Sequence, residues 1–140
     1  MTPLQVAAVQ RSFSLVVPIK EQAAQIFYDR LFSVDPSLKK LFKGDMKEQG
    51  KKLMSALALV VAGLANPQSI LPKVEELGRK HVGYGVEDRH YDTVGGALLW
   101  TLEKGLGDKF TPDVKEAWTA AYTLLATVMK GAANKARAVA

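Results

Sequence analysis

Residues 45–64 read DMKEQGKKLMSALALVVAGL, and their apolar positions recur every three or four residues. This spacing places the apolar side chains on one face of an α-helix, which turns once in about 3.6 residues. The expected inner face consists of Met46, Gln49, Leu53, Ala56, Leu57, Val60, Val61 and Leu64. Asp45 is a typical N-cap residue. The segment therefore predicts a long amphipathic helix that begins after Asp45 and ends before Asn66-Pro67.

The same helical spacing continues on both sides of this segment. Further helices are expected to begin near Pro3, Ile19, Pro36, Ser69, Asp88 and Thr111, separated by proline or glycine breaks. The alternation of polar and apolar residues that is typical of β-strands does not occur. The sequence predicts an all-α fold with a single domain over residues 1–140, in which the small and basic tail, residues 130–140, frays.

The composition excludes several classes of protein. The chain has 140 residues and no cysteine, so disulfides, thiolate-bound zinc and cysteine nucleophiles are excluded. Its net charge of +5 fits a solvated basic surface, and some of the cations also suit an anionic cofactor. Because aromatic residues do not interleave with the lysines, no nucleic acid is expected as a partner. A signal peptide and a long apolar span are both missing, which predicts a cytoplasmic protein without a membrane partner.

The two histidines, His81 and His90, stand in different surroundings. His81 follows Leu77 by four residues and Val74 by seven, so it projects from a buried apolar stripe. A buried imidazole needs partners for its nitrogens. The residues alone leave two explanations open, a core histidine bonded to a backbone carbonyl or a ligand-binding histidine. His90 follows a polar segment and is expected to be exposed.

Gln49 and Tyr28 are polar side chains within apolar helix faces. Gln49 lies three residues after Met46, and Tyr28 directly follows Phe27. An apolar pocket with a few converging polar groups would account for both residues together with His81. The alternative for Tyr28 is an edge position with its hydroxyl in water.

The order of several short motifs resembles the globins. The motifs are Phe27-Tyr28-Asp29-Arg30-Leu31-Phe32, Pro36 with Leu41-Phe42, Gln49 with Leu53, and Gly78-Arg79-Lys80-His81. They look most like the globin domain of bacterial flavohaemoglobins and the related single-domain bacterial haemoglobins. The segments 78–86 and 98–104, and Ala117-Trp118 with Tyr122, are also similar to neuroglobin. The resemblance covers roughly residues 4–130 and implies a globin fold, with helices packed around a haem pocket.

The resemblance also implies haem b as the cofactor and a set of residues around it. His81 matches the proximal histidine that binds the iron, and Phe42 matches the phenylalanine that packs against the haem plane. The matching distal residues, around a bound gas, are Tyr28, Gln49 and Leu53. The remaining expected haem contacts are Leu53 again, Lys52, Arg79, Lys80, Val86 and Tyr91, of which the three cations suit the haem propionates.

The sequence differs from the flavohaemoglobin pattern at one of the residues expected to contact His81. That pattern holds the proximal imidazole with a tyrosine and a glutamate; Tyr91 matches the tyrosine, but the glutamate position falls at Ala133. Since a carboxylate partner raises the basicity of a ligating imidazole, its loss predicts an iron less suited to oxygen-activating chemistry. We expect His81 to bond a backbone carbonyl instead, that of Leu77. Gln49 occupies the place of neuroglobin's distal histidine, so histidine-type six-coordination is not expected.

Three functions follow from the resemblance. The first is reversible binding of dioxygen, and of carbon monoxide and nitric oxide, for storage, transport or buffering. The second is the enzymatic conversion of nitric oxide to nitrate with dioxygen, with an external reductase as partner. The third, gas sensing, ranks below both because no output domain accompanies the helices. The absence of a reductase domain and of the glutamate favours the first, in a protein expected to be a monomer or a weak homo-oligomer.

Overall fold

The computed structural model describes residues 1–139 and contains six α-helices and four short 3₁₀ helices in that range. In chain order they are α1 (Pro3–Val16), η1 (Val17–Ile19), α2 (Lys20–Val34), η2 (Pro36–Leu41), α3 (Met46–Gly63), η3 (Pro67–Ser69), α4 (Leu71–Gly83), α5 (Asp88–Leu106), η4 (Gly107–Lys109) and α6 (Pro112–Val139). No strand occurs among these residues, which confirms the predicted all-α class. None of the helices in the described range combines the length and apolar content that crossing a membrane requires.

Local capping explains where several helices begin. The Asp45 carboxylate accepts a hydrogen bond from the Lys47 backbone N–H at 2.9 Å, as the N-cap prediction requires. Asp35 accepts in the same way from Ser37 at the start of η2. Thr2 and Gln5 form a reciprocal capping box at the start of α1. These bonds satisfy donors that the first helical turn leaves free.

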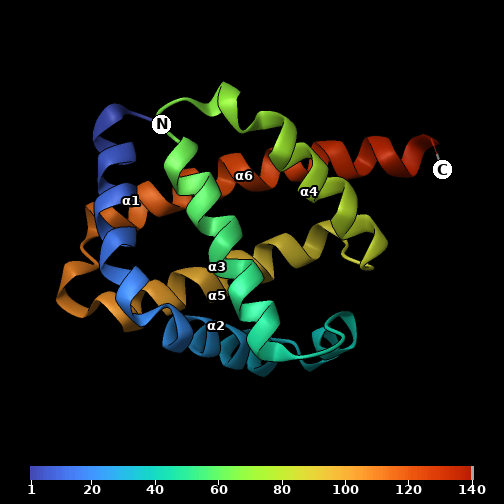
Figure 1. The fold of residues 1–140 in the computed structure, drawn as a ribbon, viewed down its shortest axis with the longest axis horizontal. Helices are drawn as coiled ribbons and strands as arrows, with labels where there is room; N and C mark the ends of the chain where they lie inside the picture. Colours follow the sequence, from blue (N-terminus) through green and yellow to red (C-terminus); the bar gives the residue numbers. More distant parts are fainter. Residues whose placement is uncertain (140) are drawn as a thin grey trace.

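The helices pack around one apolar core. Figure 1 shows α4 crossing α6, while α3 runs diagonally across the view. The principal contacts pair α4 with α6, α2 with α5 and α1 with α6. Val9, Leu31 and Ala117 are fully buried in the core, and the Trp118 indole N–H donates to Ser12 within it at 2.8 Å.

Gly78 allows α4 and α6 to approach closely. A Cβ atom at this position would lie 2.4 Å from the carbonyl oxygen of Met129. Only glycine permits this contact without a backbone shift. The contact fixes the position of α4, and hence of His81 one turn further along the helix.

Two expectations from the sequence are wrong. The tail that was expected to fray is helical as far as Val139, with Ala132 and Ala133 buried; residue 140 lies outside the described residues. His90, expected to be exposed, is only 5% exposed. Its side chain folds back, so that Nδ1 accepts the Glu87 backbone N–H at 2.9 Å and completes the cap of α5.

Candidate functional site

His81 lies in the last turn of α4 with one ring nitrogen already engaged. Its Nδ1 is 2.6 Å from the Leu77 carbonyl oxygen, which confirms the predicted partner. A carbonyl only accepts, so Nδ1 carries the proton and Nε2 keeps a free lone pair. Burial lowers the pKa of the His81 imidazole, against a smaller opposite effect of the Leu77 bond. This arrangement favours a neutral imidazole with Nε2 available as a ligand.

The turn after His81 is held by backbone bonds. The Val86 N–H donates to the His81 carbonyl at 3.0 Å. Gly85 adopts a φ of 87°, a left-handed conformation that favours glycine. Arg137 in α6 donates from Nη2 to the Val86 carbonyl at 2.7 Å. His81, Val86 and the end of α6 are therefore linked by consecutive hydrogen bonds.

Sequence reasoning missed Arg137, because its bond to Val86 spans 51 positions along the chain. No local pattern in a small and basic tail indicates such a contact.

Tyr91 in α5 approaches His81 but leaves its own hydroxyl unpaired. The two ring centroids are 6.5 Å apart. The Tyr91 hydroxyl is buried and has no hydrogen-bond partner among the described residues. Burial is the main cause that raises its pKa. Buried polar groups are paired in most proteins, so this hydroxyl is an unsatisfied donor beside the predicted iron ligand.

Tyr28, Phe42 and Gln49 come together on α2, η2 and α3. The buried Tyr28 hydroxyl donates to the Gln49 carbonyl at 3.2 Å, and burial raises the pKa of Tyr28 to about 12. The Gln49 side-chain amide donates to the Lys43 carbonyl at 3.3 Å. Phe42 meets Tyr28 edge to face at 5.3 Å between centroids. Phe32, which sequence reasoning did not include, stacks on Tyr28.

The Tyr28 hydroxyl and one N–H of the Gln49 side-chain amide are thus both engaged with backbone carbonyls. The alternative of a Tyr28 hydroxyl in water does not hold, because Tyr28 is only 8% exposed.

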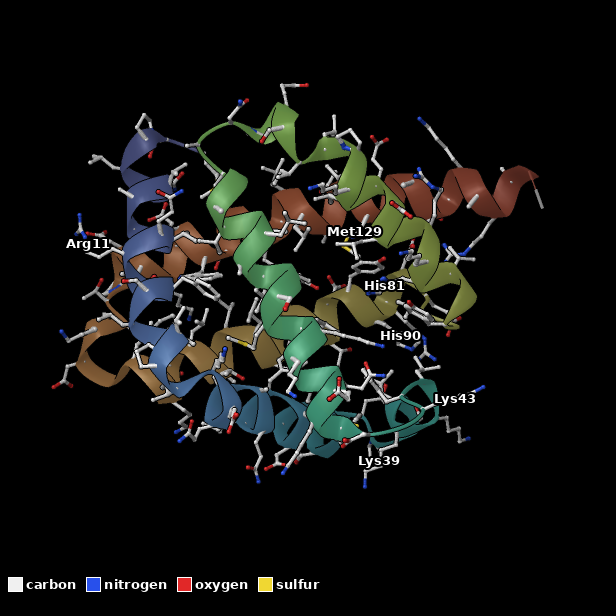
Figure 2. The ribbon with its side chains drawn as sticks, in the orientation of Figure 1. Arg11, Lys39, Lys43, His81, His90 and Met129 are labelled. Carbon is white, nitrogen blue, oxygen red and sulfur yellow. The ribbon has the colours of Figure 1, made fainter. Side chains whose placement is uncertain are left out.

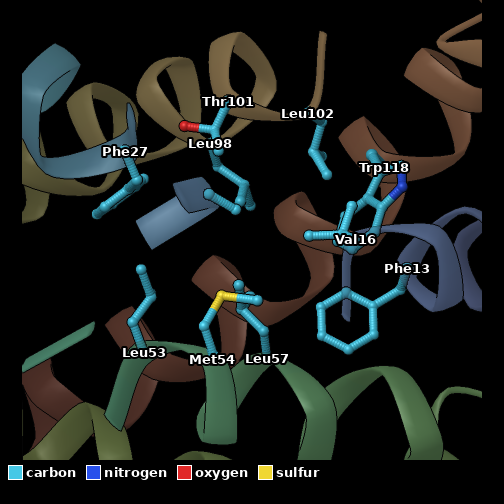
Figure 3. A pocket seen from close by; sticks show the side chains of 11 residues that line it. Phe13, Val16, Phe27, Leu53, Met54, Leu57, Leu98, Thr101, Leu102 and Trp118 are labelled. Atoms are coloured by element: carbon cyan, nitrogen blue, oxygen red, sulfur yellow. The ribbon is translucent and has the colours of Figure 1, made fainter. Parts of the chain in front are cut away.

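Leu53 in α3 borders a small apolar cavity. The cavity has a volume of about 20 Å³ and lies among α1, α2, α3, α5 and α6 (Figure 3). Its walls include Phe27, Leu57, Leu98 and Leu102. The Thr101 hydroxyl is directed to the Ala97 carbonyl at 2.8 Å, so it offers little to a polar guest. The space beside Leu53 therefore suits an uncharged group.

The three cationic side chains predicted to contact the haem propionates, Lys52, Arg79 and Lys80, make few interactions within the described residues. Lys80 pairs with Glu76 across one helical turn at 3.6 Å, and both side chains are more than half exposed. Lys52 and Arg79 are exposed and form no ion pair within residues 1–139. All three remain predictions as propionate partners.

Comparison with known proteins identifies relatives for most of the chain. The family model described as Globin matches residues 25–129. A flavohemoprotein of Vibrio cholerae is 37% identical over 119 residues, covering 80% of this chain and 30% of its own length. A flavohemoprotein of Bacillus subtilis is 34% identical over 122 residues, covering 82% of this chain and 31% of its own length. The chain thus spans about a third of the length of these relatives.

Solved structures with the same fold include two bacterial proteins. A bacterial globin from Campylobacter jejuni has a TM-score of 0.85 at 24% identity, covering 96% of this chain and 97% of its own. An engineered carbene transferase, derived from a candidate nitric oxide dioxygenase of Rhodothermus marinus, has a TM-score of 0.90 at 24% identity, covering 99% and 97%. The match of the family model and the similarity to the globin part of flavohemoproteins lead to one conclusion: the chain belongs to the globin family.

Proposed function

We propose that this protein binds haem b through His81 and reversibly binds dioxygen and other diatomic gases. The observation that carries the proposal is the hydrogen bonding of the His81 ring: Nδ1 is bonded to the Leu77 carbonyl, and Nε2 has no hydrogen-bond partner within residues 1–139. Histidines that bind metals in proteins are held in this way, with the second nitrogen bonded to a carbonyl or a carboxylate.

The residues around His81 fit a flat and largely apolar cofactor. Several large apolar side chains of α3, α4 and the turn that follows remain only partly buried, although they pack against the core; they are Leu53, Leu57, Leu77 and Val86. Phe42 is also partly buried. Covering such surface contributes about 25 cal/mol per Å². The unpaired Tyr91 hydroxyl supplies a polar contact on the same side as His81.

Haem held by His81 would supply an iron that binds a diatomic gas. Leu53, which borders the apolar cavity, would give an apolar wall to the space that the resemblance assigns to the gas. Tyr28 and Gln49 supply hydrogen-bond donors, which favour dioxygen over carbon monoxide because bound dioxygen carries more negative charge. The Tyr28 hydroxyl has one proton and must turn away from the Gln49 carbonyl to donate elsewhere, so its net gain is smaller than a full hydrogen bond. The Gln49 amide has a second N–H beside the one that contacts Lys43.

The direct test is the absorption spectrum of the purified protein after haem is supplied. We expect an intense haem band that shifts when carbon monoxide is added to the reduced protein. His81→Gly should lose this spectrum, and free imidazole should restore it by entering the space of the deleted ring. His90→Gln is the matched control, since the second histidine lies in the cap of α5 and should not be needed. A colourless wild-type protein, or a His81→Gly variant with an unchanged spectrum, contradicts the proposal.

A second candidate function is nitric oxide dioxygenation, favoured by the similarity to flavohemoproteins and by the paired donors Tyr28 and Gln49. In this reaction nitric oxide, dioxygen and one electron give nitrate: the O–O bond breaks, two oxygen atoms join nitrogen, and a separate reductase supplies the electron. Ala133, where the flavohaemoglobin pattern has glutamate, weighs against it, because the Leu77 carbonyl is a weaker partner for His81 than a carboxylate.

The two functions are separated by mixing the oxygenated ferrous protein with nitric oxide. One nitrate formed per nitric oxide, followed by repeated turnover with a reductase and a reduced nicotinamide, supports the enzyme. Slow or substoichiometric nitrate formation supports reversible gas binding alone.

A further inference from the structure

We propose that the exposed lysines of η2 and the first half of α3 form a docking surface for an acidic electron-donor protein. This lysine surface consists of Lys39, Lys40, Lys43, Lys47, Lys51 and Lys52. The proposal rests on the proposed haem binding, since a haem iron that oxidises needs an electron to return to the ferrous state.

The lysine surface holds most of the protein's excess positive charge. Residues 39–52 contain six lysines and two carboxylates, a net charge of +4 in a chain of net charge +5. The Asp45 carboxylate is occupied with the cap of α3. Glu48 pairs only with Lys51, at 3.4 Å. Within residues 1–139 the other five lysines have no ion-pair partner. Lys52 is also a predicted propionate partner, so the charge available to a binding protein is that of Lys39, Lys40, Lys43 and Lys47.

This surface lies on the outside of the cluster formed by Tyr28, Phe42 and Gln49. The Lys43 carbonyl accepts the hydrogen bond from Gln49, and Phe42 directly precedes Lys43 and packs on Tyr28. The Lys39 ammonium lies 5.9 Å above the ring of Phe32, which stacks on Tyr28. Figure 2 shows Lys39 and Lys43 projecting outward from the η2 corner. A protein that binds the lysines therefore approaches the residues that the resemblance places around the haem.

The chemistry of the surface favours a protein over a single-stranded nucleic acid. Proteins that bind single-stranded nucleic acid stack bases on exposed aromatic rings. The aromatic residues of this region, Phe32 and Phe42, are instead partly buried against Tyr28. Electron-transfer complexes have small interfaces and are short-lived. For them a one-signed charged patch speeds association through electrostatic steering, without tight binding.

The experiment measures electron transfer into the haem-loaded ferric protein. The probe is reduced flavodoxin, a small acidic flavin protein, under carbon monoxide, which traps the ferrous product. One electron passes from the reduced flavin to the ferric haem, so the flavin is oxidised and the iron is reduced. We expect the second-order rate constant to fall about tenfold between about 0.01 M and about 0.15 M salt, as screening shortens the range of the charges.

A charge-reversal variant locates the surface. Lys39→Glu combined with Lys43→Glu and Lys47→Glu should slow reduction at low salt by about tenfold or more. The matched control reverses three exposed lysines elsewhere, Lys20, Lys109 and Lys115, with the same change in net charge. The control should be slowed much less. The spectrum of each variant with carbon monoxide shows that its haem site is intact.

Each remaining outcome overturns the proposal. Equal rates for the two triple variants, with normal carbon monoxide spectra, overturn the docking surface while leaving the proposed haem binding in place. A wild-type protein that takes up no haem overturns both. Lysine-dependent binding to duplex DNA at about 0.15 M salt, with flavodoxin reduction unaffected by the variants, identifies a nucleic-acid contact instead.

Discussion

Tyr28 carries a single hydroxyl proton, and in this structure that proton goes to the Gln49 carbonyl. The bond pre-positions the hydroxyl, yet it also competes with a bound gas for the same proton. Gln49 differs, because its side-chain amide carries two N–H donors and only one bond, to the Lys43 carbonyl, occurs within residues 1–139. If Tyr28 donates to a bound gas as proposed, it exchanges one hydrogen bond for another and does not add a new one.

Tyr28→Phe should increase the dissociation rate of dioxygen by about tenfold, since losing about 1.4 kcal/mol changes a rate or equilibrium constant by one decade. Carbon monoxide, which gains little from a donor, should dissociate at nearly the wild-type rate. Stopped-flow ligand replacement measures both rates. Equal acceleration for both gases would show that Tyr28 does not donate to the bound ligand.

Two helices, α4 and α6, determine the position of His81. α4 carries the imidazole, and α6 supports α4 at two places: the Gly78–Met129 contact and the bond from Arg137 to the Val86 carbonyl. The first sets the distance between the helices, and the second holds the turn that follows His81. Loss of the first contact should lower the stability of the protein, and loss of the second should weaken its retention of haem.

Gly78→Ala should lower the free energy of unfolding by about 1–3 kcal/mol, because the added Cβ meets the Met129 backbone and the helices must move apart. Gly96→Ala in α5 is the control. A Cβ there meets nothing within 4 Å, so this substitution should be neutral or stabilise the protein by up to about 1 kcal/mol. Denaturant unfolding followed by circular dichroism measures both. A Gly78→Ala variant as stable as Gly96→Ala would refute the close contact.

Arg137→Gln should speed haem loss by about fivefold, corresponding to roughly 1 kcal/mol for a partly exposed bond from a charged donor. Transfer of haem to an excess of another apo-globin measures the rate. Arg89→Gln serves as the control, since Arg89 pairs only with Glu87 at the surface. If both variants lose haem at the wild-type rate, the end of α6 does not support the turn at Val86.

The molecule as a whole has one core, but several large apolar side chains of α3, α4 and the turn after α4 remain only partly buried against it. A protein with partly buried apolar side chains should gain stability from a ligand that covers them. Haem binds the folded state, so it should raise the unfolding free energy by about 4 kcal/mol when supplied at about a thousandfold over its dissociation constant. Thermal melts of the apo- and haem-loaded proteins test this. Coincident melting curves would contradict a site between the core helices.

The starts of the helices could be predicted from the sequence because caps act over two or three residues. Asp45, Asp35 and the proline breaks place α3, η2 and their neighbours where the apolar spacing indicated. The partner of His81 was also predictable, because the Leu77 carbonyl lies one helical turn away. His90 shows the limit of this reasoning: its polar neighbours indicated exposure, but its ring folds back onto the Glu87 N–H and is buried.

By itself, then, the sequence determined the helices, the apolar stripes and the nitrogen of His81 that remains free, since these depend on interactions within one or two turns of the chain. Only the tertiary structure decided how the helices meet. It left the Tyr91 hydroxyl without a hydrogen-bond partner within residues 1–139, brought Gly78 against Met129, and allowed Arg137 to bond the Val86 carbonyl. The Gly78–Met129 and Arg137–Val86 contacts each join residues 51 positions apart, and helical spacing carries no information at that range.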